Sequence, residues 1–180
     1  MQIQFPVIAE HVAVREWTEK DLEAYFALRQ DPGIQRYVGS APGFVDQALS
    51  RLQEDIRRTQ NRSSLRLAIE TPDNTLVGLV SLEPFNSSQK PGFELVVGIA
   101  QDHRRKQIAE SAVRALIDAV FSAGDGVTAI YGRREWGNAA SRALIRRLGF
   151  RSAGLTKASR SDAICPDRLY VLHHSSWRGA

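Results

Sequence analysis

The segment from residue 93 to residue 122 constrains the fold of this chain more than any other part of its 180 residues. Phe93–Ile99 is almost wholly apolar, with Glu94 as its one charged residue, which predicts a buried central strand. A short basic turn follows and opens the longest predicted helix, residues 104–122. A central strand that leads directly into a helix is typical of an α/β protein, in which helices pack on a mixed sheet.

The other elements are predicted from alternation, helical spacing and turn residues. The N-terminal helix opens with a capping box at Thr18 and Asp21, and Asp31-Pro32-Gly33 is predicted to stop it. Further strands are expected at residues 11–17, 65–69, 76–82, 127–131, 150–155 and 168–173, and further helices at residues 45–59 and 138–148. The predicted order is β-α-α-β-β-β-α-β-α-β-β in a single domain over residues 1–180, since no repeat or long linker interrupts it.

Composition narrows the class of protein. Hydrophobic residues make up 43% and charged residues 24%, which excludes disordered, collagen-like and disulfide-scaffold chains. No apolar run approaches the roughly 18 residues that cross a bilayer, and the first residues lack a signal-peptide pattern. We therefore expect a cytoplasmic protein without membrane contact. Cys165 is the single cysteine and His173-His174 lacks other ligands at metal spacing, so neither an intrachain disulfide nor a metal site is expected.

The charges are divided unevenly along the chain. Residues 1–103 carry 10 basic and 14 acidic side chains, whereas residues 104–180 carry 14 basic and 6 acidic ones. Of the 24 basic residues, 20 are arginine, the type that binds phosphate through a fork of N–H groups. This predicts that the C-terminal part contacts an anion. The alternative is a solvated basic surface that reflects codon bias.

The basic turn Arg104-Arg105-Lys106 stands at the N-terminus of the longest predicted helix. The first N–H groups of a helix have no partner within it, and the helix dipole adds positive potential there. Cations at this end are unfavourable unless an anion meets them. The turn therefore predicts a phosphate-binding site, with an exposed basic turn as the alternative.

The motifs around this turn resemble those of the GNAT superfamily of N-acyltransferases, most of all its RimJ/RimL-type branch. In that branch a strand with a glutamate leads to a turn of the form R-x-x-G-x-A and a long helix. A further strand then leads to N-x-x-S and a helix that ends in L-G-F. The chain matches with Glu94, Arg104–Ala109, Asn138-Ala139-Ala140-Ser141 and Leu148-Gly149-Phe150. Residues 14–21 and 167–172 resemble the family's first and last elements, so the resemblance covers nearly the whole chain.

The resemblance implies a GNAT-like fold, with a six- or seven-stranded, mostly antiparallel sheet that splays in the middle around an acyl-CoA. It implies that backbone groups of Gly98, Ile99 and Ala100 pair with the pantetheine arm. The diphosphate would bind N–H groups of the turn, which comprises Arg104, Arg105, Lys106, Gln107, Ile108 and Ala109. This turn is altered, because Gln107 stands where the family has a glycine, which lets backbone approach a phosphate closely. The change bears on acetyl-CoA binding and leaves the fold prediction intact.

The reaction that the resemblance implies is direct attack of an amine on the thioester. Glu94 would take a proton from the attacking ammonium; the alternative is that it only pairs with an arginine. Ser141 would bind or protonate the leaving thiolate. Asn138 is expected to cap the helix that begins there and, by resemblance, to contact the pantetheine. Many members carry a tyrosine acid later in this helix, where this chain has Ile145.

The acceptor is expected to be a primary amine on a small molecule or a protein N-terminus, selected by residues 30–60, 133–137 and 155–168. An alternative keeps the fold but uses aminoacyl-tRNA as acyl donor or acceptor, since the altered turn and the basic C-terminal part suit RNA. The residues expected at the acceptor or RNA are Arg133, Arg134, Trp136, Arg142, Arg146 and Arg147. A third interpretation is a noncatalytic CoA- or RNA-binding protein. The resemblance is also compatible with a homodimer.

Overall fold

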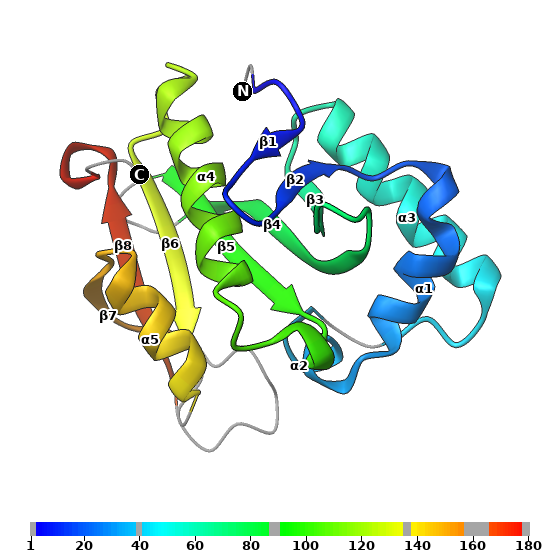
Figure 1. Cartoon of the computed structure of the whole chain (residues 1–180). Helices are drawn as coiled ribbons and strands as arrows, with labels where there is room; N and C mark the ends of the chain where they lie inside the picture. Colours follow the sequence, from blue (N-terminus) through cyan, green and yellow to red (C-terminus); the bar gives the residue numbers. More distant parts are fainter. Residues whose placement is uncertain (1–2, 39–40, 87–90, 135–137, 157–165, 178–180) are drawn as a thin grey trace.

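The computed structural model describes residues 3–38, 41–86, 91–134, 138–156 and 166–177. These residues form an eight-stranded sheet with the strand order β1-β2-β3-β4-β5-β6-β8-β7 (Figure 1). The strands are β1 Val7–Ile8, β2 Ala13–Glu16, β3 Leu65–Glu70, β4 Leu76–Asn86, β5 Pro91–Ile99, β6 Ala129–Arg134, β7 Arg151–Thr156 and β8 Asp167–His173. Among the paired strands described, β5 and β6 alone run parallel. The expected mostly antiparallel α/β sheet is confirmed.

Helices cover both faces of the sheet. They are α1 Leu22–Gln30, α2 Pro32–Val38, α3 Val45–Gln60, α4 Ile108–Ser122 and α5 Ala139–Arg147. Alternate residues of β3 enter different cores: Ala68 packs with residues of α1 and α3, while Leu67 and Ile69 pack with residues of α4. Helices α1 and α3 therefore lie on one face and α4 on the other, and Figure 1 shows α4 and α5 on the same side of the sheet.

Strand β1 and helix α2 were not predicted, and β1 raises the strand number to eight, above the six or seven expected. Strand β1 is only two residues long and pairs through Val7 with Val14 and through Ile8 with Ala13. Helix α2 begins at Pro32, directly after α1 has ended. Proline suits the first helical position because its ring fixes a helical φ and the missing N–H is not needed there. Asp31-Pro32-Gly33 therefore ends one helix and starts the next.

The sheet opens between its two parallel strands. β5 and β6 are paired from Phe93 with Ile130 to Leu95 with Gly132, and no pair is formed beyond that point. β5 nevertheless continues to Ile99 and β6 to Arg134, so their carboxyl ends diverge (Figure 1). This is the expected splay, and the basic turn follows directly at its edge.

No helix in the described ranges is both long and apolar enough to cross a membrane.

The boundaries of the predicted elements differ from the observed ones by a few residues. Helix α3 ends one residue later than expected, and the longest helix, α4, begins at Ile108 because the basic residues form the turn before it.

Candidate active site

The turn between β5 and α4 adopts the backbone conformation that favours glycine. Arg105 has a φ of 63° and Gln107 a φ of 60°, both in the left-handed region. Gln107 is also the residue immediately before α4. L-amino acids pay about 1–2 kcal/mol in this region because Cβ crowds the neighbouring carbonyl oxygen. Gln107, at the position where the resemblance leads us to expect a glycine, thus has the left-handed backbone conformation.

The turn is open to solvent at the start of α4. Arg105, Lys106 and Gln107 are exposed, whereas Ile108 is buried and anchors the helix to the core. In the described residues, no side chain caps this helix end. The first N–H groups of α4 are therefore available, together with the positive end of the helix dipole, for an anionic group.

Asp31, which lies between α1 and α2, forms hydrogen bonds to this turn. The sequence did not predict this role. Its Oδ2 accepts a hydrogen bond from the Gln101 N–H at 2.8 Å, and its Oδ1 accepts one from the Arg104 Nη2 at 2.9 Å. Oδ1 also accepts from the N–H groups of Gly33 and Ile34, which caps α2. Burial alone would raise the pKa of Asp31, but these N–H groups and the charge of Arg104 lower it below its ordinary value.

The side chain of Arg104 is held by contacts within the protein. Besides Asp31, it contacts the Ile99 carbonyl, to which Nε donates at 2.9 Å. The guanidinium lies against Gly33, where a Cβ atom would overlap it. In this arrangement Arg104 fixes the turn, and the exposed cations beside the N–H groups are Arg105 and Lys106.

Near the carboxyl end of β5, alternate residues direct their backbone N–H and C=O groups away from β4. The Ala100 N–H donates to the Val77 carbonyl on β4 at 2.9 Å. Since bonding direction alternates along a strand, Gly98 also faces β4, opposite Leu79, while Val97 and Ile99 direct their groups toward the splay. Of the three residues expected to pair with the pantetheine, Ile99 therefore has the suitable orientation.

Glu94 forms an ion pair across the parallel strands. The Arg133 Nη2 donates to its Oε2 at 2.8 Å, and the two side chains are 26% and 18% exposed for Arg133 and Glu94. The predicted arginine partner is thus present. Within the described residues the other oxygen, Oε1, accepts no hydrogen bond. Glu94 also lies directly opposite Glu83 of β4, whose Oε1 accepts from Arg66 at 2.7 Å.

Asn138 caps α5, as expected. Its Oδ1 accepts a hydrogen bond from the Ser141 N–H at 3.0 Å. The Ser141 side chain is half-buried, and its hydroxyl bonds to none of the described residues. Ile145, which stands where the resemblance leads us to expect a tyrosine acid, is buried.

The arginines expected at the acceptor or RNA do not form one exposed track. Arg134 is buried and Arg133 is engaged with Glu94, whereas Arg142, Arg146 and Arg147 are exposed on α5. Arg147 also donates to Glu110 at 3.1 Å. Trp136 lies outside the described residues, as do parts of the two later segments expected to select the acceptor.

A strand pair that splays beside an open helix N-terminus is the arrangement that the sequence motifs predicted. Residues 11–151 match the family model described as "Acetyltransferase (GNAT) domain". The chain belongs to the GNAT acetyltransferase family. This match includes Glu94, the turn, and the N-x-x-S segment.

Known GNAT proteins resemble the chain over most of its length. The uncharacterized N-acetyltransferase YoaA of Bacillus subtilis (strain 168) is 26% identical over 156 residues, which cover 85% of this chain and 87% of YoaA. The ribosomal-protein-S5-alanine acetyltransferase from Vibrio fischeri is 17% identical with a TM-score of 0.79, covering 94% and 96% of the two chains. Mycobacterium smegmatis RimJ in complex with CoA-disulfide is 20% identical with a TM-score of 0.76, covering 96% and 90%. The chain is therefore an acetyltransferase with the GNAT fold.

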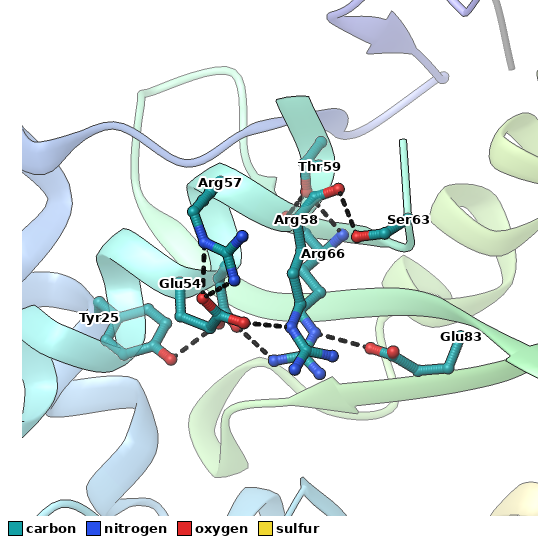
Figure 2. A network of polar contacts seen from close by, with 9 residues as sticks. Tyr25, Glu54, Arg57, Arg58, Thr59, Ser63, Arg66 and Glu83 are labelled. Atoms are coloured by element: carbon teal, nitrogen blue, oxygen red, sulfur yellow. Dashed lines mark hydrogen bonds and ion pairs between the residues drawn. The ribbon is translucent and has the colours of Figure 1, made fainter. Parts of the chain in front are cut away.

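The GNAT domain also contains a cavity of about 500 Å³ between α1, α3 and strands β3–β5. A polar network runs along it (Figure 2): the Tyr25 hydroxyl donates to Asp55 at 2.8 Å, and Arg66 donates to Asp55 at 2.6 Å and to Glu83 at 2.7 Å. Burial, together with the charge of Asp55, raises the pKa of Tyr25, so the phenol keeps its proton. Four residues that line the cavity belong to the segment 30–60 expected to select the acceptor: Ser50, Arg51, Glu54 and Asp55.

In the described part of this GNAT domain, no three histidine, cysteine, aspartate or glutamate side chains are grouped as metal ligands.

The polar network of Tyr25, Asp55 and Arg66 could not be predicted from the sequence, because its members come from α1, α3 and β3 and meet only in the folded chain.

Proposed function

We propose that this enzyme transfers an acetyl group from acetyl-CoA to a primary amine by direct attack in a ternary complex. The observation that carries the proposal is the turn after the splay, where Gln107 holds the left-handed backbone conformation at an uncapped helix start. A side chain is tolerated at this position without loss of the backbone shape that presents N–H groups to phosphates.

The coenzyme would be held by two parts of the chain. The N–H groups of the turn and of the first residues of α4 would bind the diphosphate, with Arg105 and Lys106 adding positive charge. Backbone groups of Val97 and Ile99, which face the splay, would pair with the pantetheine arm. Acetyl-CoA supplies an activated thioester when bound.

Glu94 would act as the general base. Its Oε2 is held by Arg133, which fixes the side chain, while Oε1 is available to take a proton from the amine. The amine would lose this proton as its nitrogen forms the new bond to the acetyl carbon. As the bond between the acetyl carbon and sulfur breaks, the hydroxyl of Ser141, unbonded in the described structure, would give a proton to the leaving sulfur and regain one from solvent.

The finer identity of the acceptor is inferred from similar proteins. The Vibrio fischeri protein is an alanine acetyltransferase of a ribosomal protein, which supports an amine acceptor here as well. For aminoacyl-tRNA, the support is limited to the exposed arginines of α5, since Arg134 is buried and Arg133 binds Glu94.

The test is calorimetric titration of the purified protein with acetyl-CoA, beside the Gln107→Gly variant. We expect micromolar binding by the natural protein and binding by the variant within about tenfold of it, which corresponds to 1.4 kcal/mol. Release of CoA thiol with an added primary amine would then establish transfer. No binding by the natural protein, with binding restored in the glycine variant, would contradict the proposal and direct the search to aminoacyl-tRNA.

A further inference from the structure

Arg29, on the last turn of α1, is a buried cation without a polar partner in the cavity between α1, α3 and the sheet. It is 8% exposed and lines that cavity. Its Nε is buried and forms no hydrogen bond, and none of the described residues pairs with its guanidinium. The contact that it does make is with the ring of Tyr25, whose centroid lies 6.0 Å from Cζ.

The carboxylates of the cavity are committed to other arginines. Asp55 binds Arg66 at 2.6 Å, and Glu83 binds the same guanidinium at 2.7 Å. Glu54 binds both Arg57, at 2.6 Å, and Arg58. Arg29 is thus left beside acids that are already neutralised. The C-terminal end of α1 gives it some favourable potential, but no acceptor atom.

A buried guanidinium is unfavourable unless its N–H groups are bonded and its charge is compensated. The planar fork of arginine matches the oxygens of a carboxylate or a phosphate. Since the described protein residues supply no such group, an anionic ligand is the chemistry that would complete this site.

The cavity extends to the strand that carries the candidate base. Val96 of β5 lines it together with its cross-strand partner Ser81. Glu94 lies two residues earlier on β5 and therefore projects to the same face, beside the cavity residue Glu83. One small molecule could thus extend from Arg29 to the candidate base.

We propose that the acceptor is a small amine that also carries an anionic group, a carboxylate or a phosphate, with the anion on Arg29 and the amine at Glu94. This inference rests on the proposed acetyl transfer. It predicts that the enzyme discriminates between amines by a charge remote from the nitrogen that reacts.

The experiment compares two matched pairs of acceptors at saturating acetyl-CoA: phosphoethanolamine with ethanolamine, and 4-aminobutyrate with 4-aminobutanamide. We expect the kcat/KM of the charged member to be higher in at least one pair, by about tenfold or more, as for a charge-assisted hydrogen bond. The phosphate and carboxylate pairs distinguish the two sources of the anion. A nearby negative charge raises the pKa of an amine and leaves less of it in the neutral, reactive form. Amine reactivity alone would therefore favour the neutral member of each pair.

Arg29→Met should abolish the preference, lowering kcat/KM for the charged amine and leaving the neutral amine within about twofold. Arg29→Lys should retain part of it, because lysine keeps the charge and loses the fork. Arg151→Met is the matched control, since it removes an exposed cation of β7 that does not line the cavity. Unchanged acetyl-CoA affinity shows that each variant is folded. If Arg29→Met does not fold, the comparison of Arg29→Lys with the natural protein tests the proposal.

A binding measurement separates this inference from the proposed reaction. Trp17 lines the cavity, so its fluorescence should report phosphoethanolamine binding that weakens in Arg29→Met. Such binding without acetylation of any amine would support the anion site and contradict the proposed reaction. Acetylation of both members of each pair at equal rates, unaffected by Arg29→Met, would overturn the anion site and leave the reaction standing. A preference for an alanine-starting peptide over all four small amines would also overturn it.

Discussion

Asp31 and Arg104 form an ion pair at 2.9 Å that joins the start of α2 to the turn before α4. The same carboxylate accepts from the Gln101 N–H, so one side chain fixes two residues of that connection. Asp31 touches no predicted coenzyme atom and would act by positioning the turn. Its effect should therefore appear in coenzyme affinity before it appears in the chemical step.

Asp31→Asn should weaken acetyl-CoA binding by about tenfold, equivalent to 1.4 kcal/mol, because Asn still caps α2 but no longer attracts Arg104. Calorimetry gives the affinity, and kcat at saturating acetyl-CoA should fall much less. Asp102→Asn is the matched control, an exposed aspartate one residue after Gln101. Equal effects of the two variants would contradict a positioning role for Asp31.

The stability of the enzyme should fall in acid through two aspartates. Burial alone would raise the pKa of Asp21 and of Asp31, but hydrogen bonds from Arg15 to Asp21 and from Gln101 to Asp31 outweigh it, and both values lie below the ordinary 3.8. A lowered folded-state pKa contributes stability that is present above the unfolded pKa and is lost as the pH falls through the folded value. The loss should therefore begin near pH 4 and continue below it.

Urea unfolding between pH 7 and pH 3 measures this loss. Asp31→Asn should be less stable than the natural protein at pH 7, and the difference should shrink as the pH falls to 3, because the stability contributed by a lowered pKa is lost in acid. A constant difference across this range would argue against the assignment of Asp31.

Removal of the candidate base should slow the chemical step. Glu94→Gln should lower kcat by a factor of about 100 to 10,000, the usual contribution of general acid–base catalysis, with little change in the KM for acetyl-CoA. Glu70→Gln is the control, because Glu70 is also a strand glutamate paired with an arginine but does not line the cavity. Arg133→Met should also lower kcat, since it frees the Glu94 side chain. A kcat for Glu94→Gln within about twofold of natural would leave Glu94 as an ion-pair residue only.

The left-handed residue before α4 makes a prediction about stability. Gln107→Gly should raise the free energy of unfolding by about 0.5–1 kcal/mol, because relief of the left-handed strain exceeds the extra entropy of glycine in the unfolded chain. Gln107→Ala keeps a Cβ and should change stability by only a few tenths of that. Chemical denaturation at pH 7 measures both, and a destabilised glycine variant would show that the Gln107 side chain supports the turn.

The parts of the site that could be predicted are those with a local pattern. The apolar run of β5, the basic turn and Asn138 before α5 each have neighbours in sequence that define their roles. Asp31 and Arg29 could not be found in this way. The roles of Asp31 and Arg29 depend on residues far away in the chain, such as Arg104 for Asp31 and the acids of α3 for Arg29. The start of α2 was missed although Asp31-Pro32 is a standard cap, because the same residues also end α1.

Variants of Asn138 and Ser141 should distinguish a role in helix stability from a role in catalysis at the start of α5. The cap joins the Asn138 Oδ1 to the Ser141 backbone N–H, so Ser141→Ala leaves it intact, while Asn138→Ala removes it. Asn138→Ala should therefore cost about 1 kcal/mol of stability, the usual value of an N-cap.

Ser141→Ala should unfold at the same denaturant concentration as the natural protein and yet show a lower kcat, because its hydroxyl would no longer protonate the departing thiolate. Stopped-flow detection of CoA thiol release at several pH values measures that step. The decrease should become smaller as the pH rises and the thiolate leaves without a proton. If Ser141→Ala releases thiol at the natural rate throughout, the proton comes from another donor and Ser141 serves only the helix start.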